Sequence, residues 1–291
     1  MKKKKRKGSS VLTVILVAIL LVGVGLLAYP SFSNWWNSFH QTRAVAGYVK
    51  KVDDMSAEEK EKLWNDSVAY NEKLTQEGTH FVLSKDEESE YNKTLDITGT
   101  GIMGYVQIDK IHVSLPIYHG TSQEVLQIAI GHIPGSSLPT GGKGTHCVIS
   151  GHRGLPSAKL FTDIDQLKEG DTFVLQVLDH TLTYEVDQIR IVLPDETQDL
   201  NIEAGKDYCT LVTCTPYGIN THRLLVRGHR IANAKTELEV SADAVKMDPM
   251  YIAPFIGLFL LAIILIWMLL AGRSRRKSSR FEEELKMKRK K

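Results

Sequence analysis

The sequence has few cysteines, and they lack the spacing that would gather them around a metal ion. Its 291 residues include only Cys147, Cys209 and Cys214, and no two of them are separated by two residues, as zinc ligands commonly are. Cys209 and Cys214 would lie about 16 Å apart on opposite faces of an extended strand, beyond the roughly 7 Å limit between disulfide-linked Cα atoms. We therefore expect no disulfide between these two residues, and we interpret Cys147 and Cys209 as small buried side chains.

A strong overall charge of either sign is also absent, since the formal net charge is +2. Positive charge is concentrated at the two ends: residues 1–7 carry six basic side chains, and residues 273–291 carry ten basic and three acidic ones. The region between the ends is therefore acidic. Basic runs that border apolar segments are explained by membrane orientation and anionic lipid headgroups. We predict a lipid membrane as a partner and no nucleic acid.

Two apolar segments stand out from an ordinary hydrophobic content of 43%. Residues 11–28 and 250–271 contain no charged side chain, and each run is long enough to cross a hydrocarbon layer roughly 30 Å thick as a helix. A cleaved signal peptide is the alternative for the first run, but no small-residue cleavage site follows it, and Trp35 and Trp36 are typical of a membrane interface. We predict an uncleaved anchor and a second span, with residues 30–249 outside the cell and both termini in the cytoplasm.

The composition changes from segment to segment along the chain. Residues 44–76 are polar and helix-forming, with Ser56 and Glu59 at the spacing of a capping box, whereas the charged residues 79–101 predict a surface loop. We divide the chain into a basic cytoplasmic head at 1–10, the anchor at 11–29, membrane-proximal helices at 30–78, a loop or lid-like segment at 79–100, a β-rich domain at 101–231, a stalk at 232–249, a transmembrane helix at 250–271 and a basic cytoplasmic tail at 272–291.

The β-forming sequence is concentrated in residues 101–231. Short runs of β-branched and aromatic residues alternate there with Gly, Pro, Asp and Asn, which is typical of strands joined by turns. The runs read IMGYVQI, IHVSLPIY, THCVIS, TFVLQVL, LTYEVDQIRIV, YCTLVTC and HRLLVRGHRI. They predict a mainly β domain, an antiparallel sheet closed as a barrel or packed as a sandwich, with short helices at 122–130 and 157–167.

The stretch TLVTCTPYGINTHRLLVRG, residues 210–228, carries the first candidates for chemistry. It reads as two strands joined by a turn, with Cys214 at the end of one and Arg223 at the start of the next. A thiolate is a strong nucleophile, and a nearby cation favours that form. The planar guanidinium of Arg223 can hold a carbonyl and the negative oxygen that develops on it, although Arg227, on the same strand face, competes for that role.

A histidine is needed as the proton carrier, and ten are present. His152 is favoured because it directly follows an apolar strand within the motif SGHRG, whose glycines allow close backbone approach. His132 is the main alternative. His222 adjoins Arg223 and would point to the opposite face of a regular strand.

Together these motifs resemble the signature of the sortases, the membrane-bound cysteine transpeptidases of Gram-positive bacteria. The strings GYVQIDKIHVSLPIYHGTS, GHIPGSSLPTGGKGTH, SGHRGLPSAKLFTDID and TLVTCTPYGINTHRLLVRGHR are similar to class C, the subgroup that polymerises pilins. The resemblance implies a closed β-barrel, with His152, Cys214 and Arg223 as catalytic residues and no metal or organic cofactor. It also implies cleavage between Thr and Gly of a Leu-Pro-any-Thr-Gly-like sorting signal, followed by transfer to a pilin lysine.

Three other functions stay open from the sequence. They are a sortase that attaches proteins to the cell-wall peptide crossbridge, a catalytically silent scaffold that binds sorting signals or pilins, and a hydrolytic cysteine peptidase. One family feature is missing, because residues 79–100 contain no Asp-Pro-aromatic lid motif. Phe81 and Tyr91 are the aromatic candidates to replace it, and we expect them to be exposed or simply packed.

Overall fold

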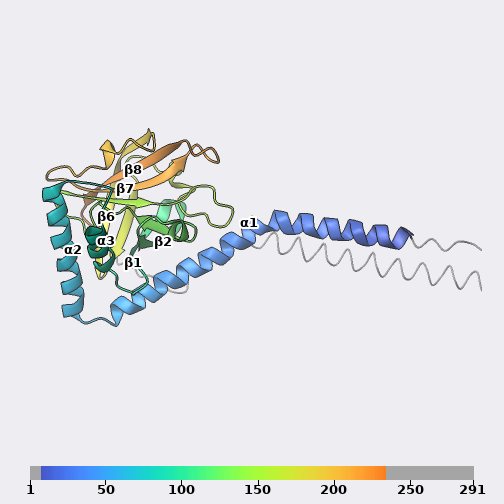
Figure 1. Ribbon diagram of the computed structural model, residues 1–291, viewed down its shortest axis with the longest axis horizontal. Helices are drawn as coiled ribbons and strands as arrows, with labels where there is room; N and C mark the ends of the chain where they lie inside the picture. The colour runs from blue at the N-terminus through green and yellow to red at the C-terminus, as the bar shows by residue number, and fades with distance from the viewer. Residues whose placement is uncertain (1–7, 234–291) are drawn as a thin grey trace, which may run out of the picture. The chain divides into compact units, whose positions relative to one another are not determined.

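Eight strands form a closed β-barrel that makes up most of the described structure (Figure 1). The computed structural model describes residues 8–233, with side chains from residue 15. The strands are β1 (Ile102–Ile108), β2 (Val113–His119), β3 (Ile130–His132), β4 (Thr145–Ser150), β5 (Thr172–Val177), β6 (His180–Val192), β7 (Asp207–Thr215) and β8 (His222–Ile231). The helices are α1 (Gly8–Asp53), α2 (Ala57–Glu77), α3 (Lys85–Lys93) and α4 (Gln123–Leu126), with 3-10 turns η1 (Asp109–Ile111), η2 (Ile164–Gln166) and η3 (Gln198–Leu200).

The order of strands around the barrel is β1-β2-β3-β4-β7-β8-β6-β5, and β5 closes it against β1. The prediction of a mainly β, closed barrel with short helices is confirmed. Most neighbours are antiparallel as predicted, but β2 with β3 and β4 with β7 run parallel. The β4–β7 pairing matters for function, because it aligns two segments that lie about sixty residues apart in the sequence.

The predicted strands agree closely with the observed ones, and the differences have local causes. All seven predicted runs form strands, and THCVIS and HRLLVRGHRI match the bounds of β4 and β8. The short strand β3 was missed because it contains only three residues and begins in the stretch 122–130, which was expected to be helical but is helical only in α4. The helix expected at 157–167 is wrong, since this stretch contains turns and only the 3-10 segment η2.

Alternate residues of the strands fill the barrel with apolar side chains, as the two-residue periodicity of a strand requires. Phe173 and Tyr184 stack inside with their ring centroids 5.6 Å apart. Gly228 of β8 makes this stack possible, because a Cβ at that position would approach the Phe173 ring to 2.7 Å. The barrel is therefore a packed core rather than a pore, and chemistry must take place on its outer face or at its rim.

Two N-terminal helices pack on the barrel through specific polar contacts. Tyr48, near the end of α1, is buried; its hydroxyl donates to the Met103 carbonyl at 3.1 Å and accepts from the Leu178 amide at 2.7 Å. On α2, which runs along one side of the barrel (Figure 1), Asn71 accepts a hydrogen bond from the Leu138 amide at 2.7 Å. The capping box predicted from Ser56 and Glu59 is confirmed at the start of α2.

The loop expected at 79–101 is only partly irregular, because α3 lies within it. Ser84 and Glu87 form a second capping box at the start of this helix, a signal that the sequence carries at the same spacing as the first. Tyr91 on α3 is buried, as expected for a packed aromatic, and its hydroxyl hydrogen-bonds His132 Nδ1 at 2.9 Å. The segment is therefore anchored to β3 rather than free in solvent.

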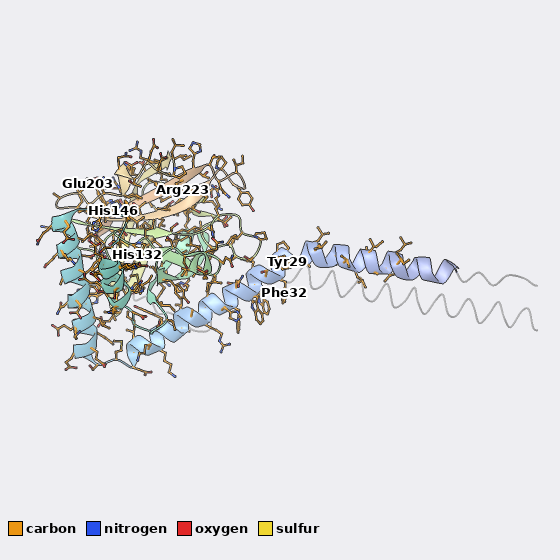
Figure 2. The ribbon with its side chains drawn as sticks, viewed as in Figure 1. Tyr29, Phe32, His132, His146, Glu203 and Arg223 are labelled. Atoms are coloured by element: carbon orange, nitrogen blue, oxygen red, sulfur yellow. The ribbon has the colours of Figure 1, made fainter. Side chains whose placement is uncertain are left out.

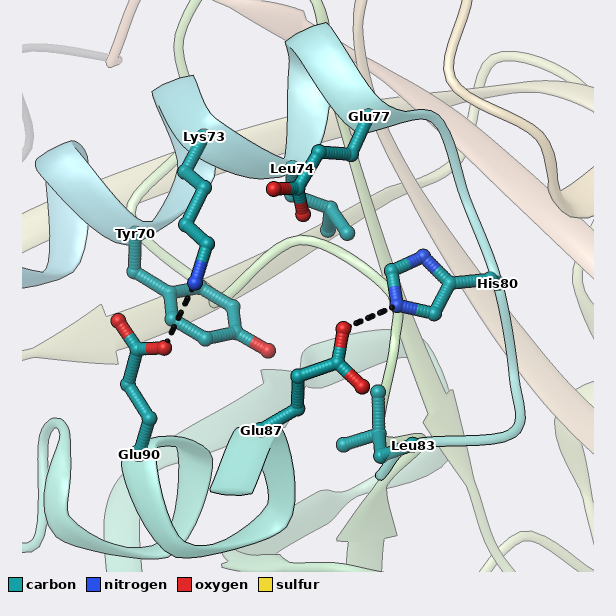
Figure 3. Close-up of a pocket in the computed structure, with 8 residues that line it drawn as sticks. All are labelled: Tyr70, Lys73, Leu74, Glu77, His80, Leu83, Glu87 and Glu90. Atoms are coloured by element: carbon teal, nitrogen blue, oxygen red, sulfur yellow. Dashed lines mark hydrogen bonds and ion pairs between the residues drawn. The ribbon is translucent and has the colours of Figure 1, made fainter. Parts of the chain in front are cut away.

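A small pocket lies between α2 and α3 (Figure 3), and ion pairs join its walls. Lys73 contacts Glu90 at 2.8 Å, and His80 contacts Glu87 at 3.1 Å. Hydrogen bonds from Ser84 hold the pKa of Glu87 at about 2, and a hydrogen bond to the Gly78 carbonyl raises the pKa of His80. The first pair connects α2 to α3, the second connects α3 to the loop before it, and neither involves the β7–β8 hairpin.

The N-terminal part of α1 has the composition of a membrane-spanning helix. Within the described residues, one helix is long and apolar enough to cross a membrane, and its stretch Ile15–Asp53 has a mean hydropathy of 2.4 in its most apolar part. Tyr29 and Phe32, labelled in Figure 2, are exposed by 56% and 46%. The anchor predicted at 11–29 therefore lies in a continuous helix, whereas the second span at 250–271 lies outside the described residues.

Candidate active site

Cys214 and Arg223 face each other across the β7–β8 pair. They are direct partners in the antiparallel register, so their Cβ atoms are on the same face and roughly 5 Å apart. Leu211 of β7 points into the barrel core. Since side chains alternate along a strand, Cys214 and Arg223 lie on the outer face. The fold therefore places these two side chains close together, as the sequence predicts.

His152 approaches Cys214 from the other side of β7. Ser150 of β4 is level with Val212 of β7 in the parallel register, and the Gly151 amide extends this pairing with a 3.0 Å hydrogen bond to the Val212 carbonyl. His152 follows Ser150 by two residues, as Cys214 follows Val212 by two, so His152 lies just beyond the end of β4 at about the level of Cys214. Because neighbouring strands lie about 4.8 Å apart, Cys214 on β7, Arg223 on β8 and the histidine just after β4 come together at one end of three adjacent strands.

The environment of His152 favours a neutral imidazole. Partial burial lowers its pKa below the ordinary value, so near pH 7 the ring is mainly uncharged and can accept a proton. Its Nε2 atom is buried and makes no hydrogen bond within residues 8–233. This nitrogen is free to exchange a proton with a group brought next to it.

Arg223 is available to bind an anion, whereas Arg227 is not. Arg223 donates to the backbone carbonyls of Asn220 and His222, at 3.3 and 3.1 Å, and no carboxylate pairs with it in the described part of the chain. Arg227 makes two hydrogen bonds to Asp187, at 3.0 and 3.2 Å. It also lies 3.5 Å from Glu203 and over the Tyr208 ring, so its charge is compensated. Arg227 is therefore structural.

His132 does not join this group. It is fully buried, its Nε2 atom contacts the Ser137 carbonyl at 2.8 Å, and Tyr91 binds its Nδ1 atom. Figure 2 labels it together with His146, which is also buried and hydrogen-bonds Thr210 at 2.7 Å. With both ring nitrogens occupied, each of these histidines serves the fold. The geometry thus favours His152 over His132, and its catalytic role stays a prediction.

The two other cysteines face the barrel interior. Cys147 of β4 and Cys209 of β7 are level in the parallel register, and each is exposed by 1% or less. Burial raises the pKa of the Cys209 thiol well above its ordinary value, which keeps it protonated and unreactive. All three cysteines are free thiols, in agreement with the expected absence of a Cys209–Cys214 disulfide.

This arrangement predicts that one thiol reacts much faster than the other two. With iodoacetamide under native conditions, we expect Cys214 to be alkylated at least about 10³-fold faster than Cys147 or Cys209, because buried thiols react only after an opening that takes a large part of the folding free energy. Peptide mass spectrometry at timed intervals measures each rate. Similar rates at all three cysteines in the native protein would contradict this arrangement, and denaturation should equalise them.

An apolar cluster on the outer face of the barrel adjoins Cys214 and Arg223. It consists of Val148, Val192, Leu200, Val212 and Leu225, with Phe81 and Ile133 packed against it. Val212 and Leu225 lie two residues from Cys214 and Arg223 respectively, on the same strand face. Phe81, from the segment between α2 and α3, is therefore a packed aromatic that covers part of this cluster.

Sequence reasoning did not single out Arg153 or Asp165. Arg153 lies within the motif SGHRG and directly after His152, so its position was visible, but nothing in the sequence indicates its contacts. In the structure it bonds Thr215, the residue after Cys214, and forms an ion pair with Asp165 of η2. These two residues belong to the surroundings of the site.

A thiol, a neutral imidazole and a guanidinium without a carboxylate partner among the described residues are the groups that acyl transfer through a thioester needs. Comparison with known proteins agrees: a sortase domain model matches residues 106–231. Sortase C1 from Streptococcus agalactiae is 53% identical, has a TM-score of 0.65 and is matched over 66% of this chain and 100% of that one. The chain belongs to the sortase family.

Two further relatives place the chain within that family. Sortase C from Clostridium perfringens, solved with the C-terminal cell wall sorting motif, is 42% identical, with a TM-score of 0.58 and coverage of 66% of this chain and 99% of that one. Sortase D from Bacillus subtilis is 30% identical over 131 residues, which cover 44% of this chain and 63% of that protein. The predicted family, its class C subgroup and the enzyme class of cysteine transpeptidases are confirmed.

Proposed function

We propose that this protein is a membrane-anchored transpeptidase that cuts a Leu-Pro-any-Thr-Gly-like sorting signal between Thr and Gly and joins the Thr to a pilin lysine. The observation that carries the proposal is the direct pairing of Cys214 with Arg223, with His152 two residues beyond the end of the neighbouring strand β4. Family membership supports the reaction type, and the Clostridium perfringens relative was solved with a sorting motif. The apolar N-terminal part of α1 supports anchoring in the membrane.

In the first half-reaction the thiol proton of Cys214 moves to the neutral imidazole of His152. The thiolate attacks the carbonyl carbon of Thr, and the guanidinium of Arg223 stabilises the oxygen as it becomes negative. The bond between Thr and Gly then breaks, and protonated His152 gives its proton to the departing glycine amine. A thioester between the substrate Thr and Cys214 remains.

In the second half-reaction an amine replaces the thiol. The lysine amine attacks the thioester carbonyl and transfers a proton to His152, and the sulfur of Cys214 leaves and regains a proton from it. An amide replaces the thioester, so the reaction conserves the free energy of the original peptide bond. This suits an enzyme outside the cell, where ATP is absent.

The acceptor distinguishes this proposal from its alternatives. The class C resemblance favours a pilin lysine, whereas a wall-attaching sortase would use the amine of the peptide crossbridge. A hydrolytic peptidase would transfer the acyl group to water even when an amine is present. A silent scaffold would bind sorting signals without forming a thioester. The half-buried Cys214 and the His152 Nε2 atom, which has no hydrogen-bond partner within residues 8–233, favour catalysis.

The full chain in detergent micelles, given a Leu-Pro-Xaa-Thr-Gly peptide and equal amounts of a pilin and a wall-crossbridge peptide, provides the test. We expect mass spectrometry to identify the Thr carbonyl joined mainly to the pilin lysine, and hydroxylamine to intercept the thioester. Product joined to the crossbridge amine would support wall attachment instead. Hydrolysis alone in the presence of both amines would support a peptidase, and binding without a thioester would support a scaffold.

A further inference from the structure

Arg153 links the two strand ends that carry His152 and Cys214. It directly follows His152, and its Nη1 atom donates a hydrogen bond to Thr215 Oγ1 over 3.3 Å. Thr215 in turn directly follows Cys214. One side chain therefore connects the neighbour of the histidine to the neighbour of the cysteine, across the gap between the ends of β4 and β7.

The guanidinium of Arg153 is held through its two Nη atoms, while its buried Nε atom makes no hydrogen bond within residues 8–233. Its Nη2 atom forms an ion pair with Asp165 on η2, and the Arg153 side chain is only 11% exposed. The guanidinium carbon lies 6.0 Å from the centre of the Tyr217 ring. Gly154 gives this ring room, because a Cβ there would meet the ring at 3.0 Å. A residue so enclosed keeps a fixed geometry.

The imidazole of His152 is held through its backbone, where Thr213 Oγ1 also donates a 2.7 Å hydrogen bond to the carbonyl of the preceding Gly151. Its Nε2 atom has no hydrogen-bond partner in the described part of the chain, so no carboxylate orients the ring through that atom. β4 ends at Ser150. After the Gly151 amide, the His152 carbonyl accepts a hydrogen bond from the Phe161 amide at 3.2 Å. The position of the ring therefore depends on the backbone of this turn.

We propose that Arg153 is a positioning residue for the transpeptidation reaction. It fixes the turn that carries His152 against the end of β7, and thereby keeps the imidazole beside the Cys214 thiol. The inference rests on the proposed function. Displacement of a reacting group by about 1 Å can reduce a rate by roughly 10²-fold, and a group that acts on chemistry rather than binding changes kcat more than KM.

The experiment compares full-chain variants on a fluorogenic sorting-signal peptide. Arg153→Gln is expected to lower kcat by about 10- to 100-fold with KM within about twofold. Thr215→Val removes the hydrogen-bond acceptor with little change in volume. The double variant carries both Arg153→Gln and Thr215→Val. If Arg153 acts through Thr215, the kcat of this double variant should be at most about twofold lower than that of Arg153→Gln alone, because effects that pass through one contact do not add.

Arg190→Gln is the matched control, since Arg190 also pairs with an aspartate, Asp199, at 2.7 Å. It should leave kcat unchanged. A second readout needs no substrate: alkylation of Cys214 by iodoacetamide should be at least about threefold slower in Arg153→Gln, because His152 no longer lies in place to take the thiol proton.

These readouts separate the two claims. If the wild type turns over the peptide, Cys214→Ala does not, and Arg153→Gln keeps the wild-type kcat and alkylation rate, the positioning role is wrong and the proposed function stands. A lower melting temperature without any change in kcat also overturns it, because Arg153 is then only structural. If the wild type does not turn over the peptide, the proposed function fails, and the alkylation rates decide the positioning role.

Discussion

Replacing Cys214 by alanine is expected to abolish thioester formation and transfer together. The proposed reaction passes through the sulfur atom in both halves, so no partial route remains once it is removed. Loss of an enzyme nucleophile typically lowers kcat by about 10⁴-fold or more. Mass spectrometry of the intact full chain after incubation with a sorting-signal peptide measures the acyl adduct, and peptide turnover measures the rate.

Cys209→Ala is the matched control for this change. Cys209 lies on the same strand as Cys214, but it points into the barrel core and is fully buried. Its replacement should cost about 1 kcal/mol of stability, as ordinary core changes do, and leave the adduct intact. Full cleavage activity in Cys214→Ala would show that Cys214 is not the nucleophile, whatever the result for Cys209→Ala.

Replacing Arg223 by lysine is expected to lower kcat/KM by about 10²- to 10³-fold, although the positive charge is kept. The loss of one preorganised donor to a developing oxyanion has this size. An ammonium is a point charge and cannot reproduce the planar fork of donors in a guanidinium. Steady-state rates with the sorting-signal peptide give the change, and circular dichroism checks that the variant folds.

Arg227→Lys provides the comparison on the same face of β8. Its guanidinium is engaged by Asp187 and Glu203, so the change should lower the melting temperature and leave kcat near the wild-type value. Undiminished turnover in Arg223→Lys would remove the proposed role of Arg223. A large loss of kcat in Arg227→Lys would instead show that Arg227 has the catalytic role proposed for Arg223.

Local sequence patterns were sufficient for most of the barrel. Runs such as THCVIS alternate residues between two faces and end at Gly or Pro, so their strand character is independent of distant partners. The pattern failed where tertiary contacts decided the structure. Ile130–His132 becomes a strand only because β2 and β4 border it, and residues 157–167 form turns although their apolar spacing resembles that of a helix.

Pairing partners were not readable from the sequence. The hairpin of β7 and β8 could be predicted because a short turn joins the two strands. The parallel pairing of β4 with β7 brings together Cys147 and Cys209, which lie about sixty residues apart. The residues of a strand do not indicate which distant strand will pair with it. The register of β4 with β7 could therefore be known only from the tertiary structure.

The sequence by itself determined the chemical groups of the site and half of its geometry. The turn between Cys214 and Arg223 places these two side chains together, because short-range backbone preferences fix a hairpin. Only the tertiary structure decided between the candidates for each remaining role. His132 and Arg227 have the same side chains as His152 and Arg223, but Tyr91 and Asp187 occupy their polar atoms. Whether a histidine or an arginine is free to act depends on its neighbours in space, and those neighbours come from distant parts of the chain.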